Sequence, residues 1–271
     1  LMRGTGQLSM QSSEQTKVVL HLGQAIDAQT KGNENLAAEE LEHAVRELGF
    51  RGASIGGHVE KSVPSATRFD VFWSKADELD VPVFMHPQNA DFFVDPSAFE
   101  GKGNLANIIG NPLETTVAAS HLIFDGVLER HPKLKIVLPH AGGYLAHYWA
   151  RMDHAWRVRP DCRTVIRKKP SSYLEKLYFD TITFDRGILK NLIERFGAGH
   201  VVLGTDYPYD MGMEHPVDFI GGTPGDSAAD KATTAEISPE APPIGENDAS
   251  CQNSPFGSES RYSLWNDSPV S

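Results

Sequence analysis

The stretch Val81-Pro-Val-Phe-Met-His86 decides the fold class, because it predicts a buried strand that ends in a polar residue. Five of its six residues are apolar, as is typical of a strand covered by helices on both faces. Helical spacing precedes it at Phe69, Phe72, Trp73, Ala76 and Leu79, and a long helix is predicted after it, from near Pro112 to about Arg130. Strands that alternate with helices in this way indicate a parallel α/β sheet.

The same alternation continues along the chain from Val18 to about Asp218. The other predicted strands are Val18-Val-Leu-His-Leu22, Ala53-Ser-Ile55, Lys135 to His140, Leu177 to Ile182 and Val201 to Asp206. About six strand–helix units result, which fits either an incomplete (β/α)₈ barrel or a doubly wound sheet. The chain contains neither a G-x-G-x-x-G nor a G-x-x-x-x-G-K-[ST] motif, so a dinucleotide or P-loop site is not supported.

Composition bounds the domain and its partners. The 271 residues carry a net charge of −11, which argues against nonspecific binding to nucleic acid or to an anionic membrane. We expect a folded domain over 18–221, between a disordered segment 1–17 and a disordered acidic Ser/Pro/Ala tail 222–271. No apolar run suits a membrane span, no signal peptide is recognisable and there are only two cysteines, so we expect a cytoplasmic protein.

Three predicted strands end in a side chain that can do chemistry, namely His86, His140 and Asp206. The carboxyl ends of parallel strands face the active-site crevice, so we expect these groups to converge there. Two imidazoles and a carboxylate could bind a divalent metal such as zinc, or act as acid and base without metal. Each residue could also simply end its strand or cap the next helix. The Gly142-Gly143 pair would allow a close backbone approach or a tight start of the next helix.

Five stretches of the chain resemble a known family. They are Val81-Pro-Val-Phe-Met-His-Pro87, Asn111-Pro-Leu-Glu-Thr-Thr116, Leu138-Pro-His-Ala-Gly-Gly143, Tyr178-Phe-Asp-Thr181 and Leu203-Gly-Thr-Asp-Tyr-Pro208. The family is the amidohydrolase-related (amidohydrolase 2) group, and the similarity is greatest to its aminocarboxymuconate-semialdehyde decarboxylase-like subgroup, which includes γ-resorcylate and 5-carboxyvanillate decarboxylases. The resemblance implies a (β/α)₈ TIM barrel of the metal-dependent hydrolase type with one divalent ion, zinc or manganese.

The resemblance also implies roles for individual residues. His86 and Asp206 match metal ligands, and His140 matches the acid or base beside the metal, with Asp206 as its catalytic partner. Arg151 matches an arginine that reaches the substrate carboxylate of a neighbouring subunit, which implies a homodimer, although it could equally be a solvated helix residue. Phe92 and Phe93 could form an apolar wall over the substrate or plug the mouth of the barrel.

One part of the family pattern is missing. The first strand of the family supplies a His-x-His or Glu-x-His pair, and nothing before His86 reproduces it. We therefore expect a chain truncated at its N-terminus and divergent at its C-terminus, with weakened metal binding. The expected strand Gly52-Ala-Ser-Ile-Gly56 carries no lysine, so the resemblance favours a mononuclear site over a pair of metals bridged by a carbamylated lysine.

The function expected from the resemblance is a metal-dependent decarboxylase (a carboxy-lyase) that acts on a small unsaturated or aromatic carboxylic acid. Loss of the first-strand ligands would impair it. Two alternatives remain open. One is a metal-dependent hydrolase of a lactone, ester or C–C bond on the same barrel. The other is an inactive barrel remnant that serves only as a binding or dimerising module.

Overall fold

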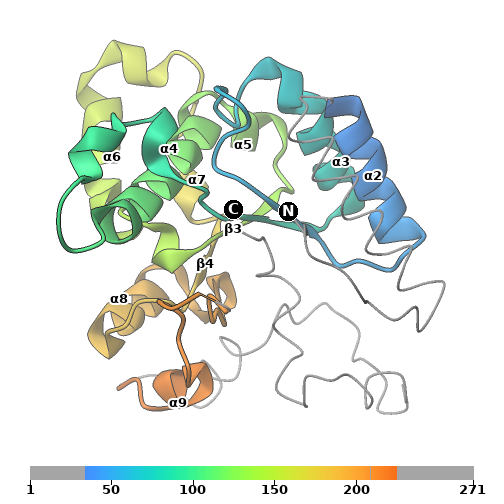
Figure 1. The fold of residues 1–271 in the computed structure, drawn as a ribbon. Helices are drawn as coiled ribbons and strands as arrows, with labels where there is room; N and C mark the ends of the chain where they lie inside the picture. Colours follow the sequence, from blue (N-terminus) through green and yellow to red (C-terminus); the bar gives the residue numbers. More distant parts are fainter. Residues whose placement is uncertain (1–33, 208, 225–271) are drawn as a thin grey trace. The chain divides into compact units, whose positions relative to one another are not determined.

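The computed structural model describes residues 34–207 and 209–224, which fall into two units of parallel strands and helices (Figure 1). The first unit contains 34–138 and 142–177, and the second contains 139–141, 178–207 and 209–224. In order, the elements of the first unit are α2 (Glu34–Arg46), β1 (Ala53–Ile55), α3 (Asp70–Leu79), β2 (Pro82–Met85), α4 (Asn111–Phe124), α5 (Val127–Arg130), β3 (Lys135–Leu138), α6 (Leu145–Val158) and α7 (Ser171–Leu174).

The strands of the first unit pair in parallel, with β2 between β1 and β3. Ser54 lies opposite Phe84 and Val83 lies opposite Ile136 in the two ladders. Each connection between these strands passes through a helix, as parallel pairing requires. The buried side chains come from the strands and from the inner faces of the helices, and they include Trp73, Val83, Met85, Ala118, Leu122, Ile136 and Leu138.

The long helix predicted from Pro112 to Arg130 is wrong in one respect, because the structure divides it into α4 and α5. The break lies at Gly126, whose φ of 79° is in the left-handed region that an α-helix cannot use. The N–H of Gly126 still bonds to the carbonyl oxygen of Ile123 at 3.0 Å, so the turn closes α4 before α5 begins.

The Gly142-Gly143 pair permits a close approach between the start of α6 and the first turn of α4. A Cβ atom on Gly143, whose φ is 62°, would overlap the carbonyl oxygen of Pro112. The next residue, Tyr144, donates its backbone N–H to Oγ1 of Thr116 at 2.9 Å. Gly143, from the predicted motif 138–143, therefore packs directly on the predicted motif 111–116.

The second unit contains β4 (Tyr178–Asp180), α8 (Arg186–Phe196), β5 (Val201–Val202) and α9 (Pro216–Gly221). β4 and β5 pair in parallel, with Asp180 opposite Val202. α8 forms the connection and packs on the strands, so that the rings of Phe179 and Phe196 lie 4.4 Å apart. Asp185 caps α8, because its Oδ1 accepts the N–H groups of Gly187 and Ile188 at 2.8 and 3.0 Å.

Five of the predicted strands are confirmed, although β5 is shorter than expected. The sixth, Val18 to Leu22, lies outside the described residues, as do the segment 1–17 and nearly all of the tail 222–271. Among the helices of the described part of the chain, none is both long enough and apolar enough to cross a bilayer.

Candidate functional site

His140 and Asp206 form a close pair in the second unit. Nε2 of His140 lies 3.5 Å from Oδ2 of Asp206, and the two side chains are only 17% and 9% exposed. A buried carboxylate needs a partner, and for Asp206 that partner is the imidazole of His140. The pair places a nitrogen and an oxygen atom side by side, in the segments that follow β3 and β5 in the sequence.

Asp180 holds the turn that carries His140. It follows two strand residues of β4 and is buried. Its Oδ2 accepts the backbone N–H of His140 at 3.0 Å, and its Oδ1 accepts those of Ala141 and Ile182 at 2.8 and 3.0 Å. Successive N–H groups of a turn commonly converge on an anion in this way. The charge and hydrogen-bond capacity of the carboxylate are thus directed at the backbone of the site.

These bonds hold a strained backbone. His140 and Ala141 have φ values of 53° and 54°, in the left-handed region that side chains other than glycine rarely adopt. Two such residues cost about 2–4 kcal/mol. Hydrogen bonds to a charged acceptor contribute about 1.5–3 kcal/mol each, so the two bonds from this turn to Asp180 offset the strain. Asp206 is left-handed as well, with a φ of 57°.

The surroundings of His140 favour its charged form. Burial lowers the pKa of the imidazole, but the carboxylates of Asp206 and Asp180 outweigh burial and raise that pKa above its usual value. Burial also raises the pKa of the Asp180 carboxyl, against the opposing effect of His140 and the N–H donors. A protonated imidazole at this position can donate a proton.

His86 lies in the first unit, immediately after β2. Its backbone N–H donates to the carbonyl oxygen of Ile55 at 2.9 Å, which extends the pairing of β1 and β2 by one step. The side chain is half-buried. His86 is thus the first residue after β2, and its role as a metal ligand stays a prediction.

Glu114 anchors the loops that follow β1 and β2. It is fully buried on α4, its Oε1 accepts the N–H groups of Gly57 and Gln88 at 3.1 Å each, and Oε2 shares the Gln88 donor. Burial raises the pKa of its carboxyl from 4.5 to about 7, although the backbone donors lower it. Gln88 is two residues beyond His86, so Glu114 fixes the path of the chain that leaves that histidine.

The structure places the predicted substrate-binding residues as follows. Phe92 and Phe93 are half-buried after β2, with ring centres 4.8 Å apart, and the ring of His58 lies 5.3 and 6.0 Å from them. Burial lowers the pKa of His58. Arg151 is exposed on α6. The two phenylalanines thus form an aromatic cluster with a histidine that the sequence did not single out.

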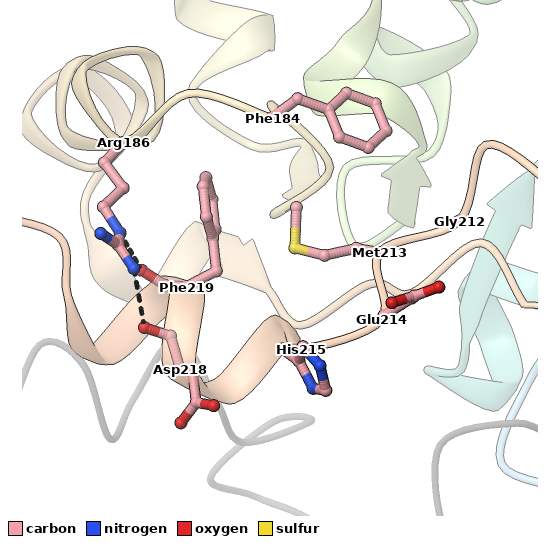
Figure 2. Close-up of a pocket in the computed structure, with 8 residues that line it drawn as sticks. All are labelled: Phe184, Arg186, Gly212, Met213, Glu214, His215, Asp218 and Phe219. Atoms are coloured by element: carbon pink, nitrogen blue, oxygen red, sulfur yellow. Dashed lines mark hydrogen bonds between the residues drawn. The ribbon is translucent and has the colours of Figure 1, made fainter.

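A separate open depression of about 500 Å³ lies in the second unit (Figure 2). The guanidinium of Arg186 donates to the carbonyl oxygens of Phe219 and Asp218 at 3.2 and 3.3 Å, which closes the end of α9. Neither His140 nor Asp206 lines the depression. Its lining residues are Phe184, Arg186, Gly212, Met213, Glu214, His215, Asp218 and Phe219.

The predicted site did not include Asp180 or Glu114, although the chain carries signals for both. Asp180 follows two apolar strand residues, as His86 follows Phe84 and Met85. Glu114 lies four and eight residues before Ala118 and Leu122, and therefore on the buried face of its helix. An acid at a predicted core position needs hydrogen-bond donors, and such an acid is a candidate anchor.

Three kinds of similarity bear on the family. A family model described as Amidohydrolase matches residues 28–233. The chain is 33% identical over 189 residues to the 2-amino-3-carboxymuconate-6-semialdehyde decarboxylase of Dictyostelium discoideum, covering 67% of this chain and 50% of that protein. It is 31% identical over 201 residues to a gamma-resorcylate decarboxylase of Polaromonas sp., covering 69% and 60%. The chain thus spans about half to three fifths of these relatives.

Solved structures agree with these sequence matches. A dihydroxybenzoic acid decarboxylase of Polaromonas sp., solved with bound manganese and an inhibitor, superposes with a TM-score of 0.69 at 27% identity, over 82% of this chain and 72% of that chain. The 5-carboxyvanillate decarboxylase of Sphingomonas paucimobilis superposes with a TM-score of 0.70 at 23% identity, over 81% and 70%. The predicted (β/α)₈ fold class is therefore confirmed, and the doubly wound alternative is not. Together, the family model, the shared motifs and the fold show that this chain belongs to the amidohydrolase family.

Proposed function

We propose that this chain is a metal-dependent decarboxylase of a small aromatic or unsaturated carboxylic acid. The observation that carries the proposal is the buried His140–Asp206 pair, with Nε2 and Oδ2 3.5 Å apart. This pair offers a proton donor next to a carboxylate that can bind a metal ion. The relatives from Dictyostelium discoideum and Polaromonas sp. are both decarboxylases.

We propose His86 and Asp206 as ligands of one divalent ion, zinc or manganese. Imidazole nitrogen and carboxylate oxygen suit both metals. The chemistry of the donors supports this choice, because Asp206 has a buried carboxylate beside the imidazole of His140 and His86 offers a further imidazole nitrogen. The Polaromonas decarboxylase was solved with bound manganese, which supports the same choice for this chain. When bound, the ion would supply a positive charge that orients the carboxylate and hydroxyl of the substrate.

His140 would hold the proton that replaces the departing carboxylate. As carbon dioxide leaves, the electron pair of the broken C–C bond stays on carbon, and Nε2 of the imidazolium donates its proton there. The carboxylates of Asp206 and Asp180 raise the pKa of His140, which favours the protonated ring before the step. Asp206, whose Oδ2 lies 3.5 Å from Nε2, stabilises the charged ring before the transfer.

We propose that Phe92 and Phe93 cover the apolar ring of the substrate, since they are half-buried and lie in the loop after β2. Arg151 would act in a homodimer, where its exposed guanidinium can reach a carboxylate bound to the other subunit.

A net charge of −11 and the presence of only two cysteines support a cytoplasmic protein that binds neither nucleic acid nor membrane.

The test is release of carbon dioxide by the purified chain loaded with zinc or manganese. The substrates are 2,6-dihydroxybenzoate and 2-amino-3-carboxymuconate semialdehyde, with a lactone as the hydrolase substrate. We expect His140→Gln to lower turnover by about 10²- to 10⁴-fold with the metal retained. His86→Ala should lower the metal content, and His147→Gln, on the exposed face of α6, serves as the control.

Two outcomes would contradict the proposal. Hydrolysis of the lactone without any release of carbon dioxide would assign the hydrolase function instead. A folded chain that binds no metal and turns over none of the substrates would favour the binding or dimerising module.

A further inference from the structure

The end of β4 contacts both loops that carry the His140–Asp206 pair. On one side, Asp180 accepts the backbone N–H groups of His140 and Ala141 at 3.0 and 2.8 Å. These two residues are in the left-handed region, which their side chains disfavour. Without an acceptor at this place, the turn would relax toward a common conformation and rotate the imidazole away from Asp206.

On the other side, the end of β4 fixes the loop that leads to Asp206. A Cβ atom on Gly204 would lie 2.8 Å from Cβ of Asp180, so only glycine allows this approach. Thr181 pairs with the same residue, because its Oγ1 accepts the Gly204 N–H at 3.1 Å and lies 3.4 Å from the Gly204 carbonyl oxygen. The two neighbours Asp180 and Thr181 thus hold one loop each.

The carboxylate of Asp180 is directed at backbone groups. It is buried and accepts three backbone N–H groups, of which two belong to the turn of His140 and Ala141 and the third to Ile182. An acid that served only to end its strand would not need to accept bonds from residues about 40 positions away. These bonds engage the backbone N–H of His140 and leave its ring nitrogens for other partners.

We propose that Asp180 is a positioning residue, which holds the His140 turn in its left-handed form so that Nε2 faces the carboxylate of Asp206. This inference rests on the proposed function for its catalytic consequence. The effect of Asp180 on the conformation of the His140 turn does not depend on the reaction. Asp180 acts through His140 and does not itself touch the substrate.

The test compares Asp180→Asn with Asp185→Asn. Both aspartates accept backbone N–H bonds within the second unit, but Asp185 does so at the start of α8. We expect Asp180→Asn to lower kcat about 10- to 100-fold, since small misplacements of a catalytic group have effects of this size. KM and metal content should change less than about 3-fold, and Asp185→Asn should leave kcat within about 2-fold.

A second measurement does not depend on activity. Amide hydrogen exchange should become at least about 10-fold faster at His140 and Ala141 in Asp180→Asn, because their acceptor is weakened. If Asp180→Asn does not fold, Asp180→Glu replaces it, since the longer side chain keeps the charge but displaces the oxygens. Unchanged exchange at His140 and Ala141 would overturn the inference even in an active enzyme. Faster exchange in a chain without decarboxylase activity would leave the positioning role standing and remove the proposed function alone.

Discussion

Replacement of Glu114 by glutamine isolates the cost of a buried carboxylate. Oε1 of Glu114 accepts both Gly57 and Gln88 N–H groups, so a glutamine oxygen at this place keeps a bond to each, and only the second contact of Gln88, with Oε2, is lost at every pH. The amide nitrogen then takes the position of Oε2. The variant therefore resembles the protonated form of Glu114 and removes its titration.

The pKa gives the size and the sign of the effect. A rise from 4.5 in the unfolded chain to about 7 in the folded one corresponds to about 3 kcal/mol of unfolding free energy. Because the folded pKa is the higher one, this stabilisation is fully present below pH 4.5 and is lost as the pH rises through 7. Between pH 5 and 8, the wild-type chain should therefore lose about 2–3 kcal/mol relative to Glu114→Gln.

Urea unfolding at pH 5, 6, 7 and 8, followed by tryptophan fluorescence, measures this difference. Glu100→Gln is the matched control, because Glu100 is exposed. The difference in unfolding free energy between Glu114→Gln and wild type should become steadily more favourable to the variant as the pH rises, and that of the control should stay flat. A difference for Glu114→Gln that is the same at pH 5 and pH 8 would refute the reasoning.

Two further substitutions test the packing of the fold. Gly143→Ala should lower the unfolding free energy by about 3 kcal/mol, because its Cβ would overlap the oxygen of Pro112 at a φ of 62°. Gly199→Ala, with no atom within 4 Å of the added Cβ, should change it by less than about 1 kcal/mol in the same urea titration. Trp73→Phe should cost about 2–3 kcal/mol, because it leaves a cavity and removes the 2.8 Å bond from the indole N–H to the Pro64 oxygen. A loss below about 0.5 kcal/mol, measured by far-ultraviolet circular dichroism in urea, would contradict this.

The strands were predictable because parallel strands buried on both faces are nearly continuous apolar runs. Val83 and Met85, like Ile136 and Leu138, are fully buried, as their sequence context indicates. The end of α4 was also encoded, since Asp125-Gly126 is a turn signal inside a helical pattern. The sequence nevertheless predicted one long helix, because Val127 and Leu128 continue the apolar spacing of α4 beyond that dipeptide.

The residues that hold the loops of the site were harder to predict from the sequence than the polar residues that follow its strands. His140 and Asp206 could be singled out because each follows an apolar strand. The role of Asp180 depends on N–H groups 40 residues away, and that of Glu114 on donors 26 and 57 residues away. Such contacts arise only when the loops have a fixed path. Burial of an acid could be predicted, but the identity of its donors could not.

The contact of Gly143 with the first turn of α4 constrains how this family can vary. Tyr144 bonds to Thr116, and Thr116 bonds in turn to the Pro112 oxygen at 2.7 Å. Substitutions at positions 112, 116 and 143 should therefore be coupled, although 116 and 143 lie far apart in the sequence. A homologue that replaces the glycine should also carry a changed residue at 116 or a displaced helix start, so substitutions at these positions should occur together across the family.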